Sequence, residues 1–494
     1  MATQRAAALA GLDLKHGEHL GLLLHDGPAL LVYALAAFAC GAIAVPLAAD
    51  LDERTLRHTL TGHSVRLLVT SDLKSVHAKA VSLLQSGCID RVIVVPQTSQ
   101  VASGAAIRLR LLGANRFART PPDQAASFVR ESDLLRDAAT RVSSNGRSLR
   151  PAAADDVAFA PMIRPDTASS TPALTHAALA ANIDQMLAAL PPLALGSERI
   201  LAAVPLSDPL AFNIVTGLAL SRTAETIIPE NLTPAALTRS LNRCRPTVVI
   251  AAPALLAETL AEPRLQRPAL ADLKFTLTLG PRPSQRMIDG YKAATLAPLL
   301  LGLCLDQAVA AIAEPRSARL GEGYRGLAGT CFAVRDLADT SREVPCGERG
   351  VLYVSGPQIA RRSRGESFLN TGQVGVVGTT GHIAVVDAIS DLIVASGYMI
   401  YPSRIENALI EHPGVTDAAV IGVSEGRRGQ APKAFVILKR GMSVTERDLR
   451  SHLSTRISKI EMPADIDFCS ALPRTPYGVV DKDALRREEA QRRR

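Results

Sequence analysis

Residues 396–478 read SGYMIYPSRIENALIEHPGVTDAAVIGVSEGRRGQAPKAFVILKRGMSVTERDLRSHLSTRISKIEMPADIDFCSALPRTPYG, the most specific pattern in the chain. Apolar residues early in this stretch, Ile405, Ala408 and Leu409, recur at helical spacing. The expected elements are a helix, two strands, a second helix and a strand, at 403–415, 417–424, 433–439, 445–458 and 465–473. This order predicts an α+β C-terminal domain over residues 391–494.

Upstream of this domain, short apolar runs alternate with segments of helical character. Strands are expected at 19–26, 42–48, 65–72, 91–97, 198–206 and 247–253. Helices are expected between them at 28–41, 52–63, 77–87, 175–191 and 233–246. Strands that alternate with helices predict βαβ units and a parallel sheet, so the fold class is α/β.

Two segments depart from this alternation. Residues 137–156 are polar and rich in turn formers, which predicts a surface loop or linker. Residues from about 320 to 386 contain short strands separated by glycine turns, which predicts a small β-rich bridge. Because 494 residues exceed one ordinary core, we expect a large N-terminal domain over 1–386, which includes the bridge, and the smaller domain that follows it.

The composition excludes several classes of function. The chain is 47% hydrophobic and 21% charged, as globular proteins are. Its net charge of +8 comes from basic residues spread along the chain, and the one cluster, at the C-terminus, is interleaved with Glu488 and Glu489. We therefore do not expect nucleic-acid binding. The seven cysteines form no CxxC pair, which predicts a reduced, metal-free cytoplasmic protein.

Residues 27–49 are uncharged and long enough to cross a bilayer. However, Gly41 interrupts the segment and Pro46 stops the pattern. A buried helix followed by a short strand accounts for it better, and no signal peptide is visible at the start of the chain. We therefore expect no membrane span.

Residues 396–478 strongly resemble the AMP-forming acyl-CoA synthetase, or adenylate-forming, family. Further stretches agree with the family in order, at 11–47, 155–160, 174–186, 198–206, 245–256, 347–357 and 371–377. The resemblance implies a large N-terminal domain of sheets and helices and a small mobile C-terminal domain. The family usually has further residues before the first of these stretches, so the first layer of the N-terminal domain is expected to be incomplete.

The resemblance also implies a reaction. Family members activate a carboxylic acid with ATP to an acyl-adenylate and release pyrophosphate, and a thiol, usually CoA, then takes the acyl group. ATP, Mg²⁺ and CoA are thus the implied cofactors, and a small carboxylic acid is the implied substrate. Because carboxylate and triphosphate are both anions, such a site needs amides that cradle phosphate, a cation, a metal-binding carboxylate and a ribose anchor.

The phosphate loop of the family ends in Pro-Lys-Gly just before a Thr-His pair. Here that loop falls on residues 162–174, which contain no glycine, and the three positions are Ser169, Ser170 and Thr171. Glycine lets a backbone approach phosphate closely. The loop is thus expected to be a decayed surface loop, unless Arg164 and the hydroxyl groups substitute.

The metal-binding segment of the family, Tyr-Gly-x-Thr-Glu, is best placed on residues 301–305. Gly302 is retained, but Leu305 stands at the position of the glutamate, and Asp306 is an alternative one residue further on. The ribose anchor is an Asp after Thr-Gly, and here the run is Thr371, Gly372 and Gln373. Gln can still form hydrogen bonds to a ribose, although it carries no charge.

Three positions lie at or after the boundary between the domains. The hinge arginine of the family is Ala388 here, and Asp391, which remains, is interpreted as structural. Ser396 and Gly397 match the segment where the thiol enters, although a plain turn explains them equally well. The lysine that grips carboxylate and phosphate is replaced by Val479, and Lys482 is a weak candidate to replace it.

On the ligand side, the family often has an aromatic residue or His where this chain has Ser207 and Asp208. An acid there would disfavour a bound carboxylate.

Loss of one charge-stabilising donor typically lowers a rate by about 10²–10³-fold. Here the phosphate cradle, metal acid, ribose acid, hinge arginine and lysine are all altered together. The favoured hypothesis is therefore a catalytically degenerate acyl-CoA-synthetase-like protein that binds or regulates an active paralogue or a carrier protein. The alternatives are a working AMP-forming ligase of fatty or aryl acids with a diverged site, and a structural protein that docks through its C-terminal domain. We expect cofactor contacts at Gly302, Thr371, Gly372 and Gly397, and no retained catalytic or metal-binding residue.

Overall fold

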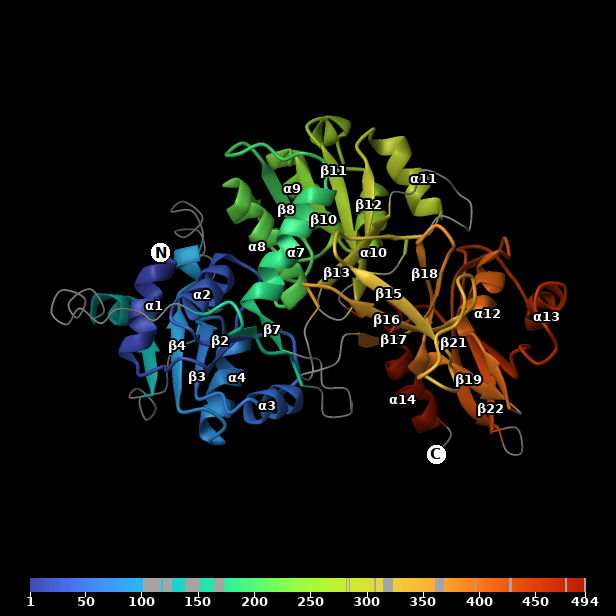
Figure 1. Cartoon of the computed structure of the whole chain (residues 1–494), viewed down its shortest axis with the longest axis horizontal. Coiled ribbons are helices and arrows are strands. Elements are labelled where there is room, and N and C mark those ends of the chain that lie inside the picture. Colours follow the sequence, from blue (N-terminus) through green and yellow to red (C-terminus); the bar gives the residue numbers. More distant parts are fainter. Residues whose placement is uncertain are drawn as a thin grey trace.

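The computed structural model describes residues 1–100, 117–118, 127–137, 152–163, 173–280, 282–283, 285–305, 308–313, 323–359, 368–395, 397–425, 429–475 and 478–492. Four sheets follow one another along the chain (Figure 1). The first two, with their helices, form the N-terminal half of the molecule. The third joins them to the fourth, which lies at the other end of the long axis with the C-terminus.

The first sheet has the strand order β5-β4-β3-β1-β2-β6-β7 and is parallel except for β7. Its strands are β1 (His19–Leu23), β2 (Ile43–Leu47), β3 (Leu67–Ser71), β4 (Arg91–Val95), β5 (Phe128–Arg130), β6 (Val157–Phe159) and β7 (Leu174–Thr175). The accompanying helices are α1 (Ala2–Gly11), α2 (Pro28–Ala39), α3 (Glu53–Gly62), α4 (Lys74–Gln85) and the short η1 (Gln97–Gln100). The strand and helix predictions for the first hundred residues are confirmed, whereas α1 was not predicted.

The second sheet has the order β14-β13-β12-β11-β10-β8-β9. Strands β8 to β12 are parallel to one another, β13 is antiparallel to β12, and β14 is antiparallel to β13. Its strands are β8 (Arg199–Ala203), β9 (Glu225–Ile227), β10 (Val248–Ala251), β11 (Phe275–Leu279), β12 (Leu299–Leu305), β13 (Ala308–Ala313) and β14 (Arg325–Gly326). Its helices are α7 (His176–Ala189), α8 (Pro209–Arg222), α9 (Pro234–Cys244), α10 (Pro253–Leu260), η4 (Arg267–Leu270) and α11 (Gln285–Ala294).

The main core lies between these two sheets, where α2, α7 and α8 are packed. Alternate residues of β8 point to opposite faces, so that Ile200 and Ala202 join this core whereas Leu201 and Ala203 join the core on the other side. Strands buried on both faces are expected to be apolar throughout, as these are. The alternation therefore gives a layered arrangement of two sheets with helices between them and on their outer faces.

Side-chain caps define where several helices begin. Asp52 accepts a hydrogen bond from the Thr55 amide at the start of α3, at 2.9 Å. Thr175 does the same for α7, with the Ala178 amide at 3.2 Å. Such caps satisfy amides that have no partner within the helix.

The bridge predicted between about 320 and 386 contains an antiparallel sheet of four strands. They are β15 (Cys331–Arg335), β16 (Gly350–Ser355), β17 (Leu369–Val377) and β18 (Ile383–Ala388). Backbone hydrogen bonds between Tyr324 and Ile383, at 2.7 and 2.8 Å, attach this sheet to the segment that leads into β14. The bridge sheet thus belongs with the N-terminal half, and the division into 1–386 and 391–494 stays a prediction.

The C-terminal part has the sheet order β20-β19-β22-β21, with β23 paired to β22. Its elements are η5 (Ile389–Asp391), β19 (Ile393–Ala395), β20 (Tyr398–Ile400), α12 (Pro402–Ile410), β21 (Val415–Glu425), β22 (Gly429–Leu438), α13 (Glu446–Ser454), β23 (Asp465–Phe468) and α14 (Lys482–Arg492). All five elements predicted from the opening stretch are confirmed. Helix α14 was missed.

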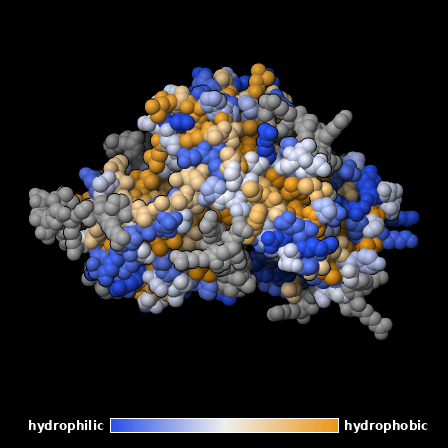
Figure 2. All heavy atoms as spheres, viewed as in Figure 1, coloured by the Kyte–Doolittle hydropathy of each residue, from blue (hydrophilic) through white to orange (hydrophobic). Residues whose placement is uncertain are grey.

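Residues 27–49 form α2 followed by β2, as the sequence predicted. Within the described ranges, no helix combines the length and the apolar character that a membrane crossing would need. In Figure 2, hydrophilic residues lie towards both ends of the long axis, and hydrophobic residues are interspersed with polar ones over the middle. The predicted loop at 137–156 falls largely outside the described residues.

Candidate functional site

The parallel strands β8, β10, β11 and β12 end at one edge of the second sheet. In open α/β sheets, ligands bind outside the carboxyl ends of the strands, because the loops that follow them meet there. The segments that follow these strands include Ser207 and Asp208 after β8, Ala254 in α10 after β10, and Gly280 after β11. This edge is therefore the candidate functional site.

Gly302 lies within β12 and pairs with Leu279 of β11. A Cβ atom at this position would lie 3.1 Å from Leu279 Cδ2 and 3.2 Å from the carbonyl oxygen of Thr278. The absence of a side chain thus lets the two strands pack closely. This role in packing does not depend on a cofactor, and the cofactor contact predicted for Gly302 stays a prediction.

The position assigned to the metal-binding acid is apolar and enclosed. Leu305 is the last residue of β12 and is only 3% exposed. The alternative ligand, Asp306, lies outside the described residues. Elsewhere in the described ranges, no three His, Cys, Asp or Glu side chains are grouped so that they could hold a metal ion.

A thiol and a phenol that sequence reasoning did not single out lie near the same edge. Burial, with a smaller contribution from the charge of Asp208, raises the pKa of the Cys304 thiol to about 12. Burial also raises the pKa of Tyr324 to about 12, against the opposing charge of Arg282. Both groups are thus neutral near pH 7. Since the thiolate is the nucleophilic form, Cys304 is not an activated nucleophile.

The acid on the ligand side has a structural partner. Asp208 caps α8 by accepting a hydrogen bond from the Ala211 amide at 3.1 Å. Asp26, which follows β1 of the first sheet, accepts a hydrogen bond from the Leu206 amide at 3.0 Å and so fixes the backbone just before Asp208. Burial raises the pKa of Asp26 to about 6, although amide hydrogen bonds from Leu206 and Ser207 oppose the shift. Two carboxyl groups therefore border this loop, which favours neutral over anionic ligands there.

The predicted ribose anchor lies within β17, where the register with β16 shifts between Asn370 and Val374. The Thr371 hydroxyl donates to the Leu352 carbonyl at 2.7 Å, and Gly372 has a φ of +68° that suits glycine. The strand register places Gln373 opposite Ala388 of β18. Two positions that the resemblance assigns to the nucleotide site thus lie side by side, but neither carries a charge.

Gly397 occupies the turn between β19 and β20, where Ala395 pairs with Tyr398. Its φ is +83°, and no atom lies within 4 Å of a Cβ built on it. The turn therefore requires a left-handed conformation but not a close approach by another chain segment. Its predicted contact with a cofactor stays a prediction, and Ser396 lies outside the described residues.

The turn that bears Val479 reaches the candidate site. A Cβ built on Gly478 would collide with Cβ of Ala254, at the start of α10. The C-terminal domain thus places this turn against the helix that follows β10. Val479 itself is 39% exposed and carries no charge.

The two cations nearest to Val479 along the described sequence are both in ion pairs. Arg474 pairs with Asp417 and donates to the Gly478 carbonyl at 2.6 Å. Lys482 lies 2.8 Å from Glu406 and 3.8 Å from Asp391, with a side chain that is 14% exposed. The idea that Lys482 replaces the missing lysine is therefore not supported by its position.

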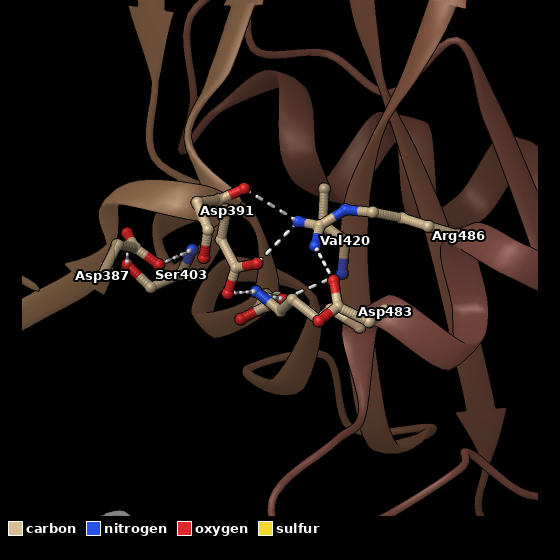
Figure 3. A network of polar contacts seen from close by, with 9 residues as sticks. Asp387, Asp391, Ser403, Val420, Asp483 and Arg486 are labelled. Atoms are coloured by element: carbon tan, nitrogen blue, oxygen red, sulfur yellow. Dashed lines mark hydrogen bonds and ion pairs between the residues drawn. The ribbon is translucent and has the colours of Figure 1, made fainter. Parts of the chain in front are cut away.

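Figure 3 shows the wider network around Asp391. Arg486 of α14 donates to Asp391 at 2.6 Å and to Asp483 at 2.7 Å. Together with Lys482, this arginine ties α14 to the segment that leads into the C-terminal sheet. Asp391 is structural, as the sequence indicated.

The described residues at the implied nucleotide site do not fit a magnesium nucleotide. Leu305, Gln373, Ala388 and Val479 are all uncharged where the chemistry would call for acids and cations. The implied phosphate loop, at 162–174, falls mostly outside the described residues. No reaction step is therefore assigned to ATP or Mg²⁺ here.

Comparison with known proteins places this fold. The profile of the AMP-binding enzyme family matches residues 1–159 and 173–362, and that of the AMP-binding enzyme C-terminal domain matches 404–478. The chain therefore belongs to the AMP-binding enzyme family, and it is an acyl-CoA-synthetase-like, adenylate-forming protein in class.

Individual relatives cover almost the whole chain. It is 26% identical over 494 residues to a feruloyl-CoA synthase from Amycolatopsis sp, covering 98% of this chain and 91% of the relative. It is 23% identical over 505 residues to a long-chain-fatty-acid–CoA ligase from Bacillus subtilis, covering 99% and 89%. ATP-bound MatB from Rhodopseudomonas palustris superposes with a TM-score of 0.79 at 21% identity, covering 99% of this chain and 92% of MatB. The chain thus has the adenylate-forming-enzyme fold, with a large N-terminal and a small C-terminal domain.

Proposed function

We propose that this chain has lost ATP-dependent adenylation of carboxylic acids and keeps a binding or regulatory role on the adenylate-forming fold. The observation that carries the proposal is the turn at Gly478 and Val479. The turn still reaches the start of α10, but Val479 carries no charge and the cation beside it, Arg474, is paired with Asp417. A fixed positive charge near carboxylate and phosphate stabilises the transition state of such a transfer, so its absence removes a large favourable contribution.

Two further features support loss of adenylation over a specialised but active site. The nearest cations, Arg474 and Lys482, are held in ion pairs within the C-terminal domain. The two positions beside each other in β17 and β18, Gln373 and Ala388, are also neutral. Effects of residues that act together are not additive, but the positions that the resemblance assigns to the metal acid, ribose acid, hinge arginine and lysine are all uncharged, at Leu305, Gln373, Ala388 and Val479.

The ligand in this proposal is the thioester of an acyl or aryl acid, whose acyl end is uncharged, rather than a nucleotide. The named relatives act on feruloyl and long-chain fatty acyl groups, which are both largely apolar. A partner in the same pathway, either an active paralogue or a carrier protein, would then receive or supply the acyl group. The proposal places this protein in the cytoplasm, with no contact to nucleic acid.

The second candidate is a working AMP-forming ligase of fatty or aryl acids. The register of Gln373 opposite Ala388 and the contact of Gly478 with α10 favour it, because they bring the positions that the resemblance assigns to the site next to other parts of the N-terminal half. In this alternative, the loop at 162–174 supplies the missing cation through Arg164.

Titration calorimetry with Mg·ATP distinguishes the lost-adenylation proposal from the working ligase. Under the favoured proposal, the purified chain gives no binding heat up to millimolar nucleotide, whereas a ligase must bind Mg·ATP in that range. An Arg164→Gln variant, titrated in the same way, tests whether Arg164 contacts the phosphates. If the unmodified chain binds and this variant does not, the favoured proposal is wrong and Arg164 has taken over the phosphate contact.

A further inference from the structure

The first helix of the C-terminal domain, α12, is hydrogen-bonded to the bridge sheet. Asp387 lies near the end of β18, where it is held in register opposite Val374 of β17. The Ser403 hydroxyl in the first turn of α12 donates to Asp387 Oδ2 at 2.6 Å, and the Ser403 amide donates to Oδ1 at 3.3 Å (Figure 3). Because β18 belongs to the bridge sheet and α12 packs on the C-terminal sheet, this pair of bonds joins the two domains.

A second contact meets the same end of α12. The guanidinium carbon of Arg349, next to the start of β16, lies 5.3 Å from the ring centroid of Tyr401. A cation over an aromatic face at this distance is attracted by the ring quadrupole. Tyr401 is the N-cap residue of α12, so both contacts act within three residues of each other.

The segment that crosses between the domains is fixed on its C-terminal side. Asp391 is bound by Arg486 and Lys482 of α14, so η5 moves with the C-terminal domain. Asp387 is bound by the ladder of the bridge sheet, so β18 moves with the N-terminal half. A rotation of one domain against the other must therefore break the bonds between Asp387 and Ser403.

We propose that Asp387 and Ser403, together with Arg349 and Tyr401, form an interdomain latch that holds the C-terminal domain in the arrangement shown. Release of the latch frees α12 and withdraws the turn at Gly478 from α10. The inference does not depend on whether the chain makes acyl-adenylates, since it rests only on contacts between the two domains.

Asp387 is well suited to this role because it is only 8% exposed. A buried carboxyl group that loses its hydrogen-bond donors is strongly disfavoured, so the bonds to Ser403 and the closed arrangement support each other. A surface pair of the same kind would contribute little.

The test compares hydrogen exchange of the full chain and of a Ser403→Ala variant. Ser458→Ala is the matched control, since its hydroxyl donates to Glu461 at 2.7 Å entirely within the C-terminal domain. Two peptides are followed, one covering 397–410 around the latch and one covering 252–260 at the distant contact with Gly478.

Ser403→Ala is expected to accelerate exchange in both peptides by about ten- to a hundredfold, the effect of losing one hydrogen bond to a charged group. Ser458→Ala is expected to accelerate exchange only near its own site. An acceleration confined to 397–410 would show a local helix cap and overturn the latch, as would no change at all. Asp387→Ala, which removes the acceptor altogether, must reproduce the effect at 252–260 for the proposal to stand.

Discussion

The ion pairs of Lys482 decide whether this residue is structural or available for chemistry. The perturbation is Lys482→Met, which keeps the length and apolar stem of the side chain and removes its charge. The change leaves Glu406 with one remaining donor, the Val420 amide at 2.8 Å. Asp391 keeps Arg486 at 2.6 Å.

The free energy that Lys482→Met should cost follows from how far the ion-paired side chains are buried. The side chains of Lys482, Glu406 and Asp391 are 14, 17 and 19% exposed, so the pairs are neither fully buried nor freely solvated. A hydrogen bond to a charged group contributes about 1.5–3 kcal/mol. Because Asp391 keeps its stronger partner, we expect a loss near the middle of that range, about 2 kcal/mol, or roughly a 30-fold change in the opening equilibrium.

The assay is native-state hydrogen exchange in β22, since the strand lies between β21 and β23 and its amides exchange when the domain opens. Lys482→Met should lower protection in β22 about 30-fold. Lys459→Met removes a charge from an exposed position and should change nothing. Unchanged protection together with altered AMP formation would mean that Lys482 is free to act at the site, and the structural interpretation would fail.

Two further predictions concern packing and pH. In Gly217→Ala, the new methyl group would collide with Ile183 where α8 meets α7, and we expect about 1–3 kcal/mol of destabilisation in thermal unfolding. Gly290→Ala in α11 meets no atom within 4 Å and should be neutral or stabilising; an equal loss in both variants would contradict the packing argument. Burial, with a smaller contribution from the charge of Glu406, raises the pKa of Asp387 from 3.8 to about 6, against hydrogen bonds from Ser403 and the charge of Lys482. A carboxyl pKa raised in the closed form means that its contribution is fully present below pH 3.8 and is lost as the pH rises through 6. Protection at 397–410, corrected for intrinsic exchange, should therefore fall between about pH 4 and 6, and Asp387→Asn should remove most of that fall; an unchanged slope in the variant would refute the assignment.

Much of the fold follows from local sequence pattern, and the missed elements have physical reasons. The strands of the first sheet were predicted because they are short apolar runs bounded by turn formers. Helix α8 was missed because most of its residues are buried and apolar residues lie on several of its faces, so it shows no amphipathic spacing. Helix α14 was missed for the opposite reason, since it is almost entirely polar and is held by ion pairs with residues far away in the sequence.

The site was predictable only in its outline. The resemblance assigned Val479 to the position of the lysine, but it did not predict that the neighbouring Gly478 packs against Ala254 of α10. The partners of Lys482 and Asp208 could not be predicted, because an ion pair or a helix cap depends on which segments fold together. A glycine such as Gly302 is equally compatible with cofactor approach and with strand packing, so the residue type alone does not distinguish the two.

The most direct test of lost adenylation is the release of AMP from Mg·ATP by the purified chain, with CoA and a pooled panel of fatty and aryl acids. A heat-killed sample gives the background, and Val479→Lys and Val479→Ala run beside the unmodified protein. We predict that the unmodified protein and Val479→Ala release no AMP above background. Turnover by the unmodified protein would contradict the account and show that another group supplies the charge.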